Sequence, residues 1–161
     1  RSPHIFSTTL RNNLTFYQPD ATEEEIAHAL ELVGLTSLVT ELPKGLDTVV
    51  GEGGRSLSGG QSQRVALARA VLHRTCLVLV FDEPTAHLDI ETEWELKQRM
   101  LPLMEGKLVF FATHRLHWLS EMDEILLLED GQVRDFGSYE ALSKANSFAY
   151  LSSNEKEGGD V

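Results

Sequence analysis

The spacing of apolar and polar positions predicts three main helices. Apolar residues recur at helical spacing between positions 26 and 33, after Thr22-Glu23-Glu24-Glu25, which predicts a capping box with Thr22 as the N-cap. A second helix is predicted over about residues 60–73, where most apolar positions face a core. A third is expected over about residues 90–103. These helices account for most of the regular structure in the first two-thirds of the chain.

Two continuous apolar runs predict buried strands between and after these helices. Residues 76–81 read Cys-Leu-Val-Leu-Val-Phe, which is typical of a strand buried on both faces, and residues 107–113 predict a second one. Asp130-Gly131, between residues 124–129 and 132–136, predicts a hairpin turn. The alternation of strands and helices indicates an α/β fold.

The start of the second helix has the composition of an anion-binding site. Ser58 is a favourable N-cap, and Gly59 and Gly60 would let backbone N–H groups approach a ligand without a Cβ in the way. The free N–H groups and the positive end of the helix dipole favour a phosphate. Gln61, Gln63 and Arg64 are expected to face outward. Arg64 and Arg69 are expected to serve as structural ion-pair partners.

Asp82 and Glu83 follow the first predicted strand, at the edge where open α/β sheets bind ligands. One carboxylate there suits Mg²⁺, directly or through water. The next points the other way along the strand and can polarise an attacking water. A phosphate cradle followed by such an acid pair is the outline of a nucleotide hydrolase.

Composition narrows the class further. The chain has 161 residues, enough for one domain or part of one, and its formal charge of −11 argues against a broad surface for nucleic acid or anionic membrane. The one cysteine, Cys76, cannot form an internal disulfide and is expected to be a small core residue, which fits a reducing cytosol. Apolar runs reach about six residues, against the ~20 of a membrane helix, and no signal peptide is visible.

Five motifs resemble those of ATP-binding cassette (ABC) ATPases. Residues 57–61, Leu-Ser-Gly-Gly-Gln, look like the signature motif, and residues 77–85 look like the Walker B strand. Residues 86–89 are similar to the D-loop, and Thr113-His114-Arg115 to the switch-histidine loop. Residues 48–54 resemble the loop before the signature in exporters, where Glu52 suggests a contact to the partner's membrane region. Their order and spacing make the resemblance specific.

The resemblance implies a P-loop NTPase-like α/β fragment with a mainly parallel core sheet. It covers residues 1–153, with a helical signature subdomain at about residues 7–74 and part of the catalytic core at residues 75–153. Residues 154–161 are expected to be a disordered tail. No G-x-x-x-x-G-K-[ST] occurs, so the Walker A strand is missing and expected upstream. Arg1 stands where the family's Q-loop Gln is expected, and a boundary artefact is the favoured explanation.

The resemblance also assigns roles to the candidate site residues. It makes Asp82 the Mg²⁺ carboxylate, Glu83 the general base, and His114 the switch that contacts the γ-phosphate of ATP. Ser58, Gly59, Gly60 and Gln61 would contact ATP held by the Walker A loop of the opposite subunit. Asp89 of the D-loop is expected to cap the next helix and to lie at the dimer interface.

The partners implied are a second nucleotide-binding domain and a transmembrane domain, at the cytoplasmic face of a bacterial inner membrane, with no nucleic acid. Residues 6–14 are either a surface for coupling helices or an ordinary packing patch. Stretches at residues 6–10 and 113–118 resemble exporters of cysteine or glutathione. Two alternatives remain: a DNA-repair or chromosome-maintenance ATPase, which predicts heptads and a basic surface, and an inactive truncated remnant. The full-length protein is expected to be an ATPase, whereas the isolated fragment is expected to be inactive without Walker A.

Overall fold

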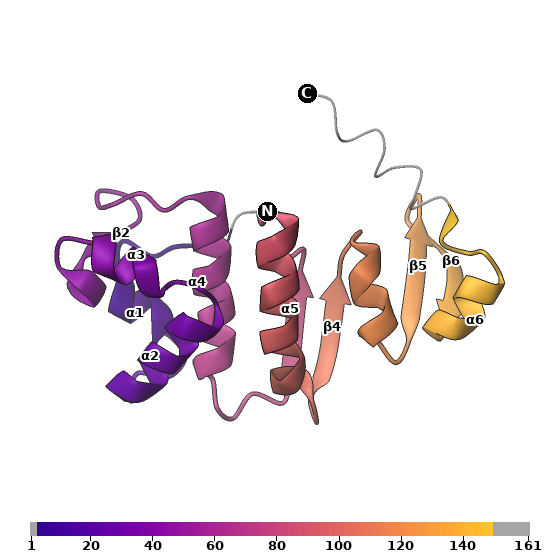
Figure 1. Cartoon of the computed structure of the whole chain (residues 1–161), viewed down its shortest axis with the longest axis horizontal. Coiled ribbons are helices and arrows are strands. Elements are labelled where there is room, and N and C mark those ends of the chain that lie inside the picture. The colour runs from indigo at the N-terminus through magenta and orange to yellow at the C-terminus, as the bar shows by residue number, and fades with distance from the viewer. Residues whose placement is uncertain (1–2, 150–161) are drawn as a thin grey trace. The chain divides into compact units, whose positions relative to one another are not determined.

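The computed structural model describes residues 3–149, which divide into two compact units, residues 3–112 and residues 113–149 (Figure 1). Each unit is described by itself. Arg1 and the predicted tail at residues 154–161 lie outside the described residues.

The first unit combines small helices with one parallel strand pair. Its elements in chain order are β1 (Thr8–Thr9), α1 (Leu10–Leu14), α2 (Glu23–Leu32), α3 (Thr36–Glu41), the 3₁₀-helix η1 (Gly45–Asp47), β2 (Val49–Val50), α4 (Gly59–Leu72), β3 (Val78–Asp82), α5 (Ile90–Met104) and β4 (Leu108–Ala112). β1 pairs antiparallel with β2, and β3 pairs parallel with β4, with α5 as the crossover between them. The α/β class and the parallel pairing of the predicted core strands are confirmed.

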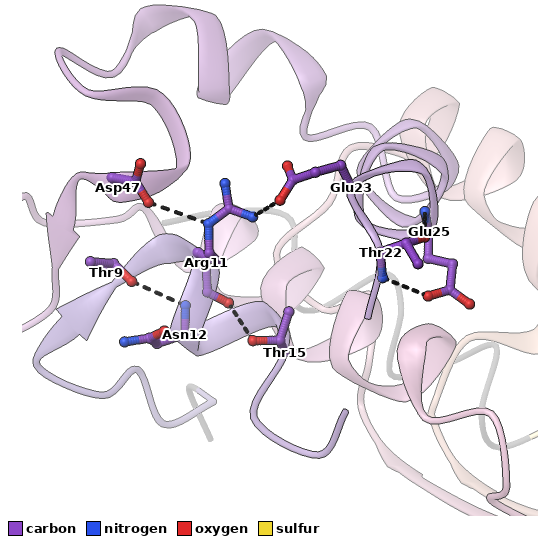
Figure 2. Close-up of polar contacts among 8 residues, drawn as sticks. All are labelled: Thr9, Arg11, Asn12, Thr15, Thr22, Glu23, Glu25 and Asp47. Atoms are coloured by element: carbon purple, nitrogen blue, oxygen red, sulfur yellow. Dashed lines mark hydrogen bonds and ion pairs between the residues drawn. The ribbon is translucent and has the colours of Figure 1, made fainter. Parts of the chain in front are cut away.

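Local capping signals define the start of the helical region (Figure 2). Thr22 and Glu25 form the predicted capping box of α2, with Glu25 N donating to Thr22 Oγ1 at 3.2 Å and Thr22 N donating to Glu25 Oε2 at 2.7 Å. Arg11 of α1 donates to Glu23 and to Asp47, and these hydrogen bonds, with Glu23 the larger cause, raise the pKa of Arg11. The surface position of these ion pairs limits their contribution to stability.

Arg69 of α4 fixes the N-terminal segment onto the helical core. Its Nε donates to Asn13 O at 2.6 Å, one Nη to Asn13 Oδ1 at 2.7 Å, and the other Nη to His4 O at 2.8 Å, while its guanidinium lies 5.3 Å from the Phe6 ring centroid. Burial lowers the pKa of Arg69. The expectation of ion pairs at Arg64 and Arg69 is wrong. Arg64 likewise donates to backbone carbonyls, those of Gly60 and Gly34, because these segments present backbone oxygens rather than carboxylates to its guanidinium.

The β3–β4 pair is buried on one face only, which corrects the prediction of two strands buried on both faces. Leu79 and Phe81 are buried, whereas Val80 is 72% exposed and Phe110, its partner across the pair, is 56% exposed. Cys76 is half-buried and precedes β3 rather than lying in it. The physical reason is that the described chain supplies covering side chains from α4 and α5 on one face only, where they line a cavity of about 140 Å³ with Leu79 and Phe81.

The second unit contains the 3₁₀-helix η2 (Leu116–Glu121), β5 (Ile125–Glu129), β6 (Gln132–Gly137) and α6 (Tyr139–Lys144). β5 and β6 form the predicted antiparallel hairpin, and its turn residues Asp130 and Gly131 have φ of 51° and 76°. Ile125, Leu127 and Leu142 form a small core. The hairpin prediction is therefore confirmed. The hairpin could be predicted because its turn depends only on residues next to one another in the sequence.

Candidate functional site

The N-terminus of α4 carries two backbone amides that find no acceptor among the described residues. Ser58 is the N-cap as predicted, and its Oγ accepts from Gln61 N at 3.1 Å while the Gln61 side chain accepts from Ser58 N at 2.9 Å. Among the described residues, none accepts a hydrogen bond from the amides of Gly59 or Gly60, which are half-buried. The Gln61 side chain is used in a capping box, so the Gly59 and Gly60 N–H groups and the Ser58 hydroxyl are the groups of this turn that could still bind an anion.

The two glycines also let the following loop approach the helix. A Cβ on Gly60 would lie 3.2 Å from the carbonyl oxygen of His87, and one on Gly59 would lie 3.3 Å from the His87 ring. Side chains at these positions would push against the D-loop. The glycines therefore serve close packing within this chain as well as access to the helix N-terminus.

Asp82 and Glu83 lie at the carboxyl end of β3, as predicted. Asp82 is exposed on the same side of the strand as Val80, whereas Glu83 is half-buried. Glu83 has φ of 47°, a left-handed backbone conformation that is uncommon for residues other than glycine. Its N–H donates to Ala112 O at the end of β4, at 2.9 Å. Strain of this kind persists where surrounding contacts over-determine the backbone, and it concentrates at functional sites.

Gln63 was predicted to face outward, and that prediction is wrong. It is 4% exposed, its Nε2 donates to Glu83 O at 2.6 Å, and its Oε1 accepts from His87 N at 3.1 Å. The signal that could have found it is its position four residues before Leu67, on the buried side of α4. A polar side chain on that stripe has to satisfy its hydrogen bonds inside the protein.

Asp89 caps α5, as predicted. Its Oδ1 accepts from Thr92 N at 2.9 Å and its Oδ2 from Thr92 Oγ1 at 2.7 Å, and these bonds lower the pKa of the Asp89 carboxyl. The preceding Thr85 bonds the buried Glu93 of α5. The segment between β3 and α5 is thus tied at both ends. The placement of Asp89 at a dimer interface stays a prediction.

His114 belongs to the second unit, two residues after the end of β4 in the chain. Its side chain is exposed, in a bend whose Thr113 Oγ1 accepts from Arg115 N at 3.0 Å. Ser58 to Gln61, Asp82, Glu83 and Asp89 all belong to the first unit. The role of His114 as a γ-phosphate switch stays a prediction.

A hollow of about 460 Å³ runs along α4 and β3 and reaches Asp82 and Pro84.

Within residues 3–149, no group of three or more His, Cys, Asp or Glu side chains could hold a metal ion by itself. Of the helices that the structure describes, none has the length and apolar character to span a membrane.

Comparison with known proteins shows close relatives. The chain is 56% identical over 144 residues to the glutathione/L-cysteine transport system ATP-binding/permease protein CydC of Bacillus subtilis, covering 89% of this chain and 25% of that protein. It is 41% identical over 150 residues to the ATP-dependent lipid A-core flippase of Vibrio vulnificus, covering 92% of this chain and 26% of the flippase. The chain thus spans about a quarter of the length of these relatives.

A solved structure of similar fold also belongs to an ABC exporter. It is described as the structure of a bacterial Atm1-family ABC exporter with ATP bound, and it matches with a TM-score of 0.82 at 30% identity, covering 96% of this chain and 27% of that one. The ABC transporter family pattern matches residues 2–86, which include the α4 N-terminus and the end of β3. The chain therefore belongs to the ABC transporter family, and its fold is that of an ABC exporter ATPase.

Proposed function

We propose that this chain is the greater part of a nucleotide-binding domain that hydrolyses ATP and drives an exporter. The observation that carries the proposal is the pair of carboxylates at the carboxyl end of the parallel β3–β4 pair, with Glu83 held in a left-handed conformation. Parallel sheets bind ligands at this edge, and the family relationship makes that ligand a nucleotide. A Walker A loop outside this sequence would complete the site.

The donor set at the end of β3 fits Mg²⁺. Mg²⁺ in phosphoryl-transfer sites uses one or two carboxylates together with substrate phosphates and water, so a cluster of three protein ligands is not required. Asp82, exposed at the strand end, would hold the ion directly or through water. Bound there, Mg²⁺ would supply positive charge against the phosphate oxygens.

Glu83 acts as the general base in this proposal. Its backbone is held by two hydrogen bonds: its N–H donates to Ala112 O, and its carbonyl accepts from Gln63 Nε2. These bonds fix the position from which the Glu83 carboxylate would orient a water molecule. His114, in an exposed bend of the second unit, would contact the γ-phosphate. Both roles depend on positioning and charge, which dominate phosphoryl transfer.

The amides of Gly59 and Gly60, with Ser58 and Gln61, would bind ATP held by a second nucleotide-binding domain. Two such domains would then form a head-to-tail dimer in which each supplies the signature turn to the other. The absence of an acceptor for these amides among the described residues supports this role. Asp89, exposed beside α5, would lie at the dimer junction.

The exported substrate is proposed to be cysteine or glutathione. The support is that identity to the CydC protein of B. subtilis is 56%, whereas identity to the lipid A-core flippase is 41%. The domain would work at the cytoplasmic face of the membrane, next to a transmembrane domain in the same transporter. Uptake of labelled cysteine and glutathione by inside-out vesicles of the full-length transporter tests the assignment, and ATP-dependent accumulation of neither would contradict it.

Glu83→Gln in the full-length transporter tests the hydrolytic role. Loss of a general base lowers rates by about 10²–10⁴-fold, so we expect turnover to fall at least ~100-fold while ATP binding stays within about twofold. Phosphate release and equilibrium nucleotide binding measure the two quantities. Turnover within a few fold of the native rate would contradict the general-base role.

A further inference from the structure

We infer that Gln63 is a positioning residue that joins the signature helix to the general base and the D-loop, so that the groups serving two ATP molecules move as one body. The inference rests on the proposed function. The observation behind it is that the buried side-chain amide of Gln63 lies between the carbonyl of Glu83 and the N–H of His87.

The amide uses both of its functions at once. Nε2 donates to Glu83 O at 2.6 Å, and Oε1 accepts from His87 N at 3.1 Å, so the two bonds span the turn that contains Pro84, Thr85 and Ala86. Few side chains other than Gln carry a donor and an acceptor on one rigid planar group at this reach. At 4% exposure, water cannot easily replace either bond.

The bond to Glu83 acts on a strained residue. Glu83 has φ of 47°, and its N–H is held by Ala112 O. Its carbonyl accepts from Gln63 Nε2 and also, at 3.2 Å, from Ala86 N. Without the Gln63 bond, the peptide after Glu83 would lose its link to α4 and could relax toward ordinary φ. Its carboxylate would then shift relative to the water that it orients.

The bond to His87 acts on the other side of the turn. His87 lies against Gly59 and Gly60, the residues whose amides are proposed to bind the partner's ATP. In the proposed dimer, α4 contacts ATP at the partner's Walker A loop, whereas Glu83 serves ATP at this domain's own Walker A loop. Gln63 therefore connects the two sites by side-chain contacts within one unit of this chain.

The test compares Gln63→Met and Gln63→Glu with native protein in the full-length transporter. Gln63→Met keeps length and burial but has neither hydrogen bond, and we expect kcat to fall at least tenfold with ATP affinity within twofold, since misplacement by ~1 Å can cost ~100-fold. Gln98→Met, the same substitution at an exposed position of α5, is the matched control and should leave both unchanged.

Gln63→Glu supplies a second measurement, the pH dependence of kcat, which a mere loss of packing would not change. A protonated carboxyl has one donor and one acceptor, as the amide does, whereas a carboxylate has acceptors only. Position 63 is 4% exposed, and burial disfavours a carboxylate, so the introduced carboxyl should keep its proton at pH 6 and lose it towards pH 9. The ratio of the Gln63→Glu kcat to the native kcat should therefore fall over this range. Glu83 and His87, the titratable residues of the held turn, are present in both proteins, so the native pH profile measures their own contribution.

The outcomes separate the inference from the proposed function. A Gln63→Met kcat within twofold of native, an equal loss of ATP affinity and kcat, or a Gln63→Glu ratio that is flat with pH would each overturn the inference. If Gln63→Met fails to fold, the pH dependence of the Gln63→Glu ratio still decides. Glu83→Gln, measured alongside, reports on the proposed function alone: its loss of turnover with an unaffected Gln63→Met would reject only the inference.

Discussion

The surroundings of α4 and of the β3–β4 pair differ in how much of their packing this chain supplies. Val65 and Ala68 of α4 are fully buried, and even the polar Gln63 and Arg69 find partners within the first unit. Val80 and Phe110, in the centre of the strand pair, are more than half exposed. The packing around α4 is thus supplied within the first unit, whereas β3 and β4 present an exposed apolar face. In the proposed domain, residues outside this sequence would cover that face.

The largest expected effect is at the two faces of β3. Leu79→Lys in the 161-residue chain should lower the free energy of unfolding by about 3 kcal/mol or more, because it places a charge in a packed face. Val80→Lys, one position along at 72% exposure, should change it by less than about 0.5 kcal/mol. Urea unfolding of both variants measures the contrast, and equal losses would refute the one-sided packing.

The full-length transporter sharpens the same comparison. If the exposed face is covered there, Val80→Lys should become as destabilising as Leu79→Lys. Thermal unfolding of the purified transporter measures this. A harmless Val80→Lys in that setting would mean that the face stays open.

A smaller effect is expected at Arg69. Arg69→Ala removes three hydrogen bonds to Asn13 and His4 and leaves the buried backbone oxygen of Asn13 without its donor, which should cost about 2–3 kcal/mol of unfolding free energy. Arg74→Ala is the control, since the ion pairs of the half-exposed Arg74 with Asp20 and Glu25 lie at the surface and are worth at most about 1 kcal/mol. Similar losses in the two variants would argue against the role of Arg69 in fixing the N-terminal segment.

The smallest effect is the pH dependence of the α5 cap. Because the folded state lowers the pKa of Asp89 below its ordinary value of 3.8, its contribution to stability is present above that value and is lost as pH falls through the folded pKa. Asp89→Asn keeps an oxygen acceptor but does not titrate. The stability difference between native and variant should therefore be constant above about pH 4 and shrink at lower pH. A difference that grows on acidification would contradict the sign.

Features set by neighbours in sequence were predictable, and features set by distant partners were not. The caps at Thr22, Ser58 and Asp89 and the Asp130-Gly131 turn depend on residues within a few positions, and all are confirmed. By contrast, the hydrogen bonds of Arg69 reach 56 and 65 residues along the chain. No local pattern distinguishes such carbonyl partners from carboxylates.

The site divides in the same way. The positions of Asp82 and Glu83 at a strand end followed from the apolar run before them, although that run overstated the burial of the strand. The left-handed backbone of Glu83 and the burial of Gln63 arise where β3, β4 and α4 meet. Only their mutual packing reveals that α4 holds the turn after β3.

An experimental structure of the full-length Glu83→Gln transporter with ATP and Mg²⁺ tests the central claim most directly. The account predicts that Gly59 N, Gly60 N and Ser58 Oγ lie within hydrogen-bond distance, about 3 Å, of the phosphates of an ATP bound to the other subunit. These groups facing away from nucleotide in the closed, ATP-bound dimer would contradict it.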